Sequence, residues 1–252
     1  MTGALVCWLT RRLLRLRYRV MANGIDVIAA RGTSGILFLP NHPALIDPVI
    51  LLSELHRRFR PRPLADKDQI NRPLVRSLAR LIRAFPMPDP VAYGQHSHAE
   101  VELAIASCIA ALKRGENILL YPAGRIMRHQ TSDLAGSSAV ETILREAPAV
   151  RVVLIRTTGL WGSAFSRAAG RAPQLGPLIV RLLGAVLANG VFFGPRRTVK
   201  LELVEPVDLP RQAGRAVLNR YLEEFFNRNA PPGLYVPYTC WERGGRRDLP
   251  EP

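Results

Sequence analysis

Residues 38–48 read FLPNHPALIDP, in which His42 is followed five positions later by Asp47. The apolar run at 36–39 predicts a short buried strand that ends here and delivers the histidine into a loop. Asp47 then falls near the start of the next helix, where the helix dipole favours a carboxylate. From there the carboxylate can accept the Nδ1 proton of the histidine, fix its tautomer and raise its basicity.

The His42–Asp47 pair predicts a general base with an orienting carboxylate. No nucleophilic serine or cysteine stands beside it, so the base is expected to deprotonate a hydroxyl or an amine that a substrate supplies. An asparagine before the histidine, and a proline after both residues of the pair, make the pattern more specific than His-x4-Asp alone. The opposing interpretation is a structural Asn-His-Pro turn in which Asp47 only caps a helix.

A second motif, LLYPAGRI, occupies residues 119–126. A buried strand over 117–121 is expected to lead into a Pro-Gly loop with Arg125 at its mouth, and Arg128 and His129 follow. Loop amides and the fork-shaped guanidinium group suit a phosphate or a carboxylate. The motif therefore predicts an anion site at the end of this strand.

With these two motifs at this separation, the chain resembles the glycerolipid (lysophospholipid) acyltransferase family, of the 1-acylglycerol-3-phosphate acyltransferase type. That family carries a His-x4-Asp box and, later, an aromatic-Pro-Glu-Gly box whose nearby arginine binds the phosphate of the acceptor. Here Arg125 follows Gly124 directly, as in the acyltransferase domain of bacterial acyltransferase–acyl-carrier-protein ligase fusions. The resemblance extends over residues 17–228.

The resemblance implies a membrane-associated O-acyltransferase of phospholipid biosynthesis. The acyl group would arrive as a thioester on coenzyme A or acyl carrier protein, and His42, oriented by Asp47, would take the proton of a lysolipid hydroxyl. Amides at 122–125 would help to hold the oxyanion. No cofactor beyond the acyl co-substrate and no metal ion are expected, since His96 and His98 have no acidic or cysteine partner nearby. The expected substrate contacts are Asn41, Pro122, Gly124, Arg125, Arg128 and Lys67.

Two positions depart from the family pattern. Ala123 stands where the family has a glutamate, which normally braces the loop or its arginine. The segment PMPDP at 86–90 stands where many members carry Ile-Asp-Arg, so one usual phosphate contact is missing and Asp89 is given no catalytic role. These departures keep two alternatives open: an acyltransferase-like module that binds lipid without turnover, and an acceptor other than a glycerolipid, such as a lyso-ornithine lipid.

The 252 residues carry a formal net charge of +15, which predicts an acidic partner. The basic residues are scattered, without zinc-finger spacing or an RNP-like aromatic run, and this argues against nucleic acid. Residues 9–18 instead interleave arginines with leucines, as in a basic amphipathic segment that lies on an anionic membrane surface. The alternative is that the arginine bias of a GC-rich genome inflates the charge.

Cysteine usage and the N-terminus bear on location. Cys7, Cys108 and Cys240 are widely spaced and predict reduced thiols. The first ten residues do not have the pattern of a signal peptide. We therefore expect a peripheral protein at the cytoplasmic face of the cell membrane.

Strands that alternate with helices predict a single-domain α/β sandwich around a mostly parallel sheet flanked by helices. Residues 1–16 are expected to form the basic amphipathic segment and 17–228 the acyltransferase domain. The Pro/Gly/Arg-rich tail, 229–252, is expected to be a linker or a segment ordered against something else. Its likeness to a domain junction suggests an acyl-activating ligase as a partner.

Individual elements follow from local patterns. Asn23-Gly24 predicts a hairpin between two short strands within 17–30. The most apolar segment, 175–193, predicts a helix that either packs in the core, the favoured placement, or dips into a membrane. Further strands are expected at 36–39, 63–65, 84–87, 117–121, 150–157 and 198–204, and helices after Asp47 to 58, at 74–82, at 97–113 with Ser97 as its cap, and at 211–227.

Overall fold

The centre of the fold is a sheet whose strands are almost all parallel. The computed structural model of the protein describes residues 2–67, 76, 79–80, 82–87, 98–190 and 193–249. Among these residues, β6 and β7 form the one antiparallel pair of the large sheet, which confirms the predicted mostly parallel α/β fold. The strand order is β1 (Tyr18–Asn23), β7 (Arg197–Val204), β6 (Arg151–Thr158), β2 (Ile36–Pro40), β5 (Ile118–Leu119), β3 (Arg62–Asp66), β4 (Phe85–Met87).

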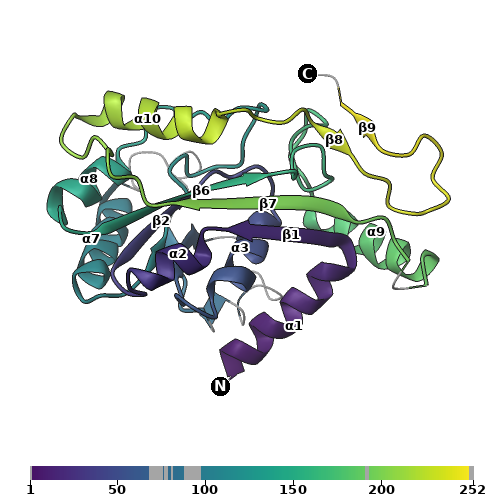
Figure 1. Cartoon of the computed structure of the whole chain (residues 1–252), viewed down its shortest axis with the longest axis horizontal. Coiled ribbons are helices and arrows are strands. Elements are labelled where there is room, and N and C mark those ends of the chain that lie inside the picture. The colour runs from purple at the N-terminus through teal and green to yellow at the C-terminus, as the bar shows by residue number, and fades with distance from the viewer. Residues whose placement is uncertain are drawn as a thin grey trace.

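Helices cover both faces of this sheet. One buried cluster receives side chains from α7 (His98–Lys113), α8 (Ala139–Glu146) and α10 (Arg215–Asn227). The other cluster receives them from α2 (Ile25–Ala30), α3 (Asp47–Leu55) and α9 (Leu175–Ala188). The N-terminal helix α1 (Thr2–Arg17) packs against α3. Figure 1 shows α10 above the strands, and α1, α2 and α3 below them.

The two-residue period of the strands divides the core between these two faces. On β2, Leu37 and Leu39 join the cluster under α7, α8 and α10, whereas Ile36 and Phe38 join the cluster on the opposite face. The strand is buried along its whole length. A strand covered by helices on both sides reads as an uninterrupted apolar run, which is why the sequence pattern identifies β2.

Most predicted elements appear near their expected positions. β2, β3, β4, β6 and β7 confirm the predicted strands, and α3, α7 and α10 confirm predicted helices, although α10 begins at Arg215 and α3 ends at Leu55. β5 is shorter than predicted, but the Leu120 amide still donates to the Phe38 carbonyl at 2.9 Å. The sequence patterns do not predict the short helix α8. The predicted helix at 74–82 lies largely outside the described residues, as do Ser97, Asp89 and His96 altogether.

The predicted hairpin at Asn23-Gly24 is wrong. β1 pairs in parallel with β7, and the residues after Gly24 form α2 instead of a second strand. Gly24 adopts φ 95°, and a Cβ at this position would overlap the Leu203 carbonyl oxygen. The glycine therefore allows its backbone to lie close to β7, a strand far along the chain. A two-residue turn signal cannot reveal such a distant contact.

The prediction that residues 175–193 pack in the core is also wrong for most of the segment. The segment does form a helix, α9, and its Leu178 and Leu182 pack against the cluster under α2 and α3. Val180, Leu183 and Leu187 on the same helix are exposed. Apolar composition predicts burial, but only part of this helix finds apolar surface on its own domain.

The C-terminal tail is ordered against the domain itself. Arg197 at the start of β7 is buried and donates to the carbonyls of Gly159 (2.9 Å), Gly162 (3.1 Å) and Leu234 (2.8 Å). Burial lowers the pKa of this guanidinium to about 10, so it remains charged at neutral pH. Leu234–Tyr235 (β8) then pairs with Arg247–Asp248 (β9) in a small antiparallel ribbon.

Within the described ranges, none of the helices combines the length and the apolar character that are needed to cross a membrane.

We expect Gly24→Ala to destabilise the fold. The substitution places a Cβ against the Leu203 carbonyl in a left-handed backbone conformation, which costs at least about 2 kcal/mol of unfolding free energy. Urea denaturation followed by circular dichroism measures the change. The matched control is Gly184→Ala, inside α9 with open space around it, where alanine should stabilise by up to about 1 kcal/mol. Equal effects of the two substitutions would contradict the role assigned to Gly24.

Candidate active site

The structure brings His42 and Asp47 together at the end of β2. The strand ends at Pro40, and the next amide, Asn41 N–H, still donates to Ile155 O on β6 at 3.2 Å. Asp47 is the first residue of α3 and its exposed fraction is 0%. Its Oδ2 lies 2.7 Å from Nδ1 of His42. A buried carboxylate in this position holds the imidazole in the tautomer that carries its proton on Nδ1.

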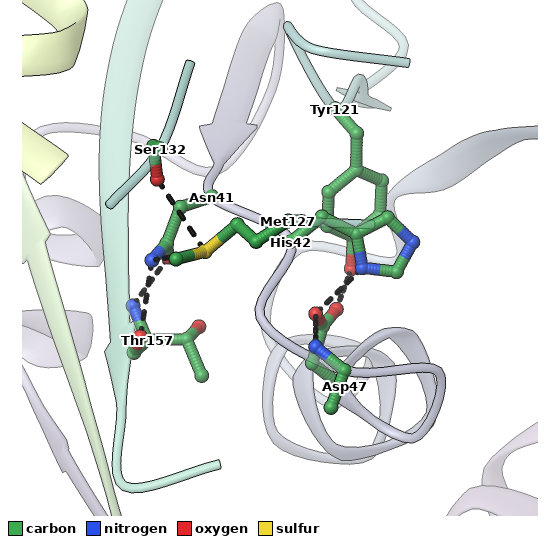
Figure 2. Close-up of polar contacts among 8 residues, drawn as sticks. Asn41, His42, Asp47, Tyr121, Met127, Ser132 and Thr157 are labelled. Carbon is green, nitrogen blue, oxygen red and sulfur yellow. Dashed lines mark hydrogen bonds and ion pairs between the residues drawn. The ribbon is translucent and has the colours of Figure 1, made fainter. Parts of the chain in front are cut away.

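Two further donors satisfy the Asp47 carboxylate (Figure 2). The Ala44 amide donates to Oδ2 at 3.4 Å, and the Tyr121 hydroxyl donates to Oδ1. The Tyr121 ring also stacks on His42, with 4.2 Å between the ring centroids and 29° between their planes. Burial, together with the nearby charge of Asp47, raises the pKa of Tyr121 well above its ordinary value, so the phenol stays protonated as a donor.

Tyr121 is the member of the candidate site that the sequence patterns do not reveal. It is the aromatic position of the second motif, where its ring predicts a buried strand residue and nothing more. The contact with Asp47 spans 74 positions of the chain. The available signal is the hydroxyl group itself, since a buried tyrosine needs a hydrogen-bond partner.

Asn41 joins the histidine loop to the end of β6. Its side-chain Oδ1 accepts from the Thr157 amide at 2.7 Å, and its Nδ2 donates to the Thr157 carbonyl at 3.1 Å. Figure 2 shows this amide beside Thr157, on the opposite side of the loop from Asp47. Asn41 is predicted to contact the substrate. Its side-chain amide already bonds to Thr157 and fixes the histidine loop to β6.

A cavity of about 130 Å³ opens beside His42. It is lined by both sequence motifs and by the segment that follows the second one, including Pro122, Arg125 and Arg128. His129, Asp133 and Phe226 also line it. The predicted base and the two predicted anion-binding arginines therefore share one cavity.

The loop of the second motif is held to the histidine loop by its backbone. The Met127 amide donates to the His42 carbonyl at 2.8 Å. Gly124 adopts φ 62°, and its amide donates to the Tyr121 carbonyl at 2.9 Å, so this amide is not available to a substrate. Within the part of the chain that the structure describes, the amides of Ala123 and Arg125 make no such bond.

Arg125 and Lys67 have acidic partners. The Arg125 guanidinium lies 3.3 Å from Asp133 Oδ2 at the exposed mouth of the cavity. Asp133 thereby supplies the arginine with a carboxylate in a loop where Ala123 has none. Lys67 pairs with Glu100 at 3.2 Å and does not line the cavity, so the structure does not bring this predicted substrate contact to the others.

A second, smaller cavity of about 30 Å³ lies next to the first and shares Asn41, Met127 and Phe226 with it. Its other walls come from the end of β6 and from the tail, including Trp161, Pro231 and Pro232. Aromatic and proline side chains make this space mainly apolar. The site thus combines a basic histidine, an arginine-lined cavity and an adjoining apolar space.

Comparisons with known proteins bear on the family to which the chain belongs. Residues 19–158, which contain both motifs, match the sequence model of the family described as acyltransferase. Comparison with curated proteins found no match. Among solved structures, the chain is similar to the crystal structure of the 1-acyl-sn-glycerophosphate (LPA) acyltransferase PlsC from Thermotoga maritima, with 17% sequence identity and a TM-score of 0.61 over 91% of this chain and 80% of that chain. At this identity the structural likeness concerns the fold. Because the family model matches more than half of the chain, the protein belongs to the acyltransferase family of enzymes.

Proposed function

We propose that this acyltransferase moves a fatty acyl group from a thioester to a hydroxyl of a lysophospholipid or a related lipid. The observation that carries the proposal is the His42–Asp47 pair, held at 2.7 Å beside a cavity that Arg125 and Arg128 also line. The acceptor class is further supported by the fold of the 1-acyl-sn-glycerophosphate acyltransferase that this chain resembles. The thioester is carried by coenzyme A or acyl carrier protein, the latter in combination with an acyl-activating ligase.

In the proposed reaction His42 is the general base. Because Asp47 engages Nδ1, the lone pair on Nε2 is free to take the proton of the acceptor hydroxyl. The oxygen attacks the thioester carbonyl and forms a tetrahedral oxyanion, for which the Ala123 and Arg125 amides are the candidate donors. The intermediate collapses, the C–S bond breaks, and the departing thiolate recovers the proton from His42. No acyl-enzyme is formed.

The two cavities divide the substrates between them. Arg125 and Arg128 are charged donors for the phosphate of the acceptor. The apolar space bounded by Trp161, Pro231 and Pro232 suits the first carbons of an acyl chain. Asn41 lies between the two spaces, and its bonds to Thr157 keep the wall between them fixed.

The enzyme is proposed to work as a peripheral protein at the cytoplasmic face of an anionic membrane. α1 supports this location, because Leu5, Leu9 and Leu13 are exposed on a helix that also carries arginines, while Leu14 packs against the core. Arginine side chains beside exposed leucines suit the headgroup region of anionic lipids.

Ala123 motivates a second candidate, a module that binds lipid without turnover. The proposed mechanism asks nothing of a carboxylate at this position, since Asp133 already pairs with Arg125. The two candidates differ in one result, namely whether acyl transfer exists and depends on His42.

His42→Ala is expected to lower acyl transfer at least about 10³-fold, because the hydroxyl loses its base. The measurement is transfer of labelled acyl groups from acyl-coenzyme A and acyl carrier protein to a panel of lysolipids in membranes that carry the protein. His129→Ala is the matched control, because His129 lines the same cavity without a carboxylate partner in the described chain, and its rate should stay within about tenfold of the native rate. Absence of transfer with every donor and acceptor, while both forms still bind lipid, would favour the non-catalytic module.

Arg125→Ala is expected to raise KM for phosphate-bearing lysolipids about tenfold or more, with a smaller effect on kcat. The loss corresponds to a charged hydrogen bond of about 1.5–3 kcal/mol. Arg145→Ala on α8 removes an arginine outside the cavity and serves as the control. An equal rise in KM for a neutral acceptor such as a monoacylglycerol would contradict a phosphate contact and support a different acceptor class.

Tyr121→Phe is expected to lower kcat about tenfold while KM changes little. The ring still stacks on His42, but Asp47 loses one of its donors, and a charged hydrogen bond of this kind contributes about 1.5–3 kcal/mol. Asp47 is then held less firmly, so it orients the His42 imidazole less well for proton transfer. Tyr221→Phe on α10, which removes a 2.7 Å bond to Asp208, is the matched control and should leave kcat unchanged. A native kcat in Tyr121→Phe would show that the hydroxyl does not act through the pair.

A further inference from the structure

α9 presents an apolar face to solvent. Val180, Leu183 and Leu187 follow the i, i+3, i+7 spacing of one helix face, and their exposed fractions are 71%, 60% and 75%. Leu178 and Leu182 point the other way and fix the helix to the core. The helix contains no acidic residue, so no negative charge on it opposes contact with an anionic surface.

Two aromatic side chains extend this face beyond the end of the helix. Phe193 and Trp241 are exposed at 77% and 79%. The Trp241 indole nitrogen lies 3.5 Å from the Ala188 carbonyl at the end of α9. Asn189 holds the two segments together, since its Oδ1 accepts from the Cys240 amide at 3.0 Å and its Nδ2 donates to the Tyr238 carbonyl at 2.9 Å. The α9 patch consists of Val180, Leu183, Leu187, Phe193 and Trp241.

Arginines flank the residues of the α9 patch along the chain. Residues 164–196 contain no acidic residue but include Arg171, Arg181 and Arg196. Arg181 lies over the Tyr238 ring at 4.5 Å from its centroid. Glu242 is the one acidic residue of 239–247, and it is occupied by Tyr235 and by the Tyr238 amide. An exposed apolar face with cationic flanks is complementary to an anionic lipid surface.

The α9 patch belongs to the edge of the sheet that carries the active site. Pro40 at the end of β2 is the register partner of Ile155 on the parallel strand β6, and α9 is the next helix or strand after β6 in the chain. Arg17 at the end of α1 lies over the same Tyr238 ring as Arg181, at 4.6 Å. Figure 1 shows the C-terminal end of α1 at the same end of the sheet as α9.

We propose that the α9 patch is a membrane-docking surface, which inserts its apolar side chains into the headgroup region of an anionic bilayer. The helix would lie in the plane of the interface, with Trp241 at headgroup depth and the arginines on lipid phosphates. The delivery of a lysolipid from the bilayer to His42 rests on the proposed function, whereas docking itself does not. An acidic carrier protein fits less well, because the patch has few of the polar groups that form the rim of a protein interface.

Vesicle flotation of the full-length protein tests the docking surface. With equimolar phosphatidylglycerol and phosphatidylcholine, Leu183→Glu and Leu187→Glu should each weaken partitioning about tenfold or more. Leu103→Glu on α7, exposed at 69% on the opposite face of the sheet, is the matched control and should bind as the native protein does. Thermal unfolding should be the same for all the variants. Native-like binding of both α9 variants, or equally tight binding to pure phosphatidylcholine, would overturn the proposal.

Tryptophan fluorescence gives a second measurement that does not depend on lost binding. In a background of Trp8→Phe and Trp241→Phe, a Leu187→Trp variant should be quenched by brominated lipid, and a Leu103→Trp variant should not, while Trp161 remains buried in both. A vesicle-bound Leu187→Trp protein without quenching would contradict insertion of this face.

Two further arms separate the possible failures. Vesicle binding is measured without acyl donor and therefore does not depend on acyl transfer. If the protein binds vesicles through the α9 patch but shows no transfer activity, the docking proposal stands and the proposed function is rejected. Binding of acyl carrier protein in the absence of lipid should be unaffected by Leu183→Glu. If that substitution abolished carrier binding while vesicle binding stayed native, the face would belong to a protein partner.

Discussion

The site depends on the hydrogen bonds that the buried carboxylate of Asp47 accepts. A carboxylate withdrawn from water is costly unless hydrogen bonds replace its hydration. Here the donors come from three places in the chain: the His42 ring, the Ala44 amide and the Tyr121 hydroxyl. The charge is stable only when the loop after β2, the first turn of α3 and the loop after β5 have all assembled. The same contacts therefore complete the fold at this edge and orient the His42 imidazole.

The sheet brings these loops together because its central strands are parallel. β2, β5 and β6 all end at the same edge, so the loops that follow them meet without any further device. Backbone contacts then set their relative positions, with Met127 bonded to His42 and Asn41 bonded to Thr157. The position of His42, the arginine-lined cavity and the apolar space are consequences of this convergence.

Arginine has two different uses in this protein, and the net charge of +15 does not distinguish them. Arg197 is buried and binds carbonyl groups that hold the tail to the domain, and Arg17 does the same for Val236 and Pro237. These guanidinium groups are occupied by backbone carbonyls and are not free to bind an acidic partner directly. Arg171 and Arg196, by contrast, are exposed around α9, where an anionic surface can reach them.

The sequence by itself determined what depends on neighbouring residues. The apolar run before His42 specified β2, and the spacing to Asp47 placed the carboxylate at the start of a helix. It also identified the arginine loop after β5, because residue types and short spacings encode local structure. The tertiary structure decided whatever depends on distant partners. Tyr121 acquired its role from Asp47, and Gly24 serves an approach to Leu203 rather than a hairpin. One face of α9 is exposed, although its composition is apolar. Apolar composition favours burial, but it does not specify the surface against which a helix packs.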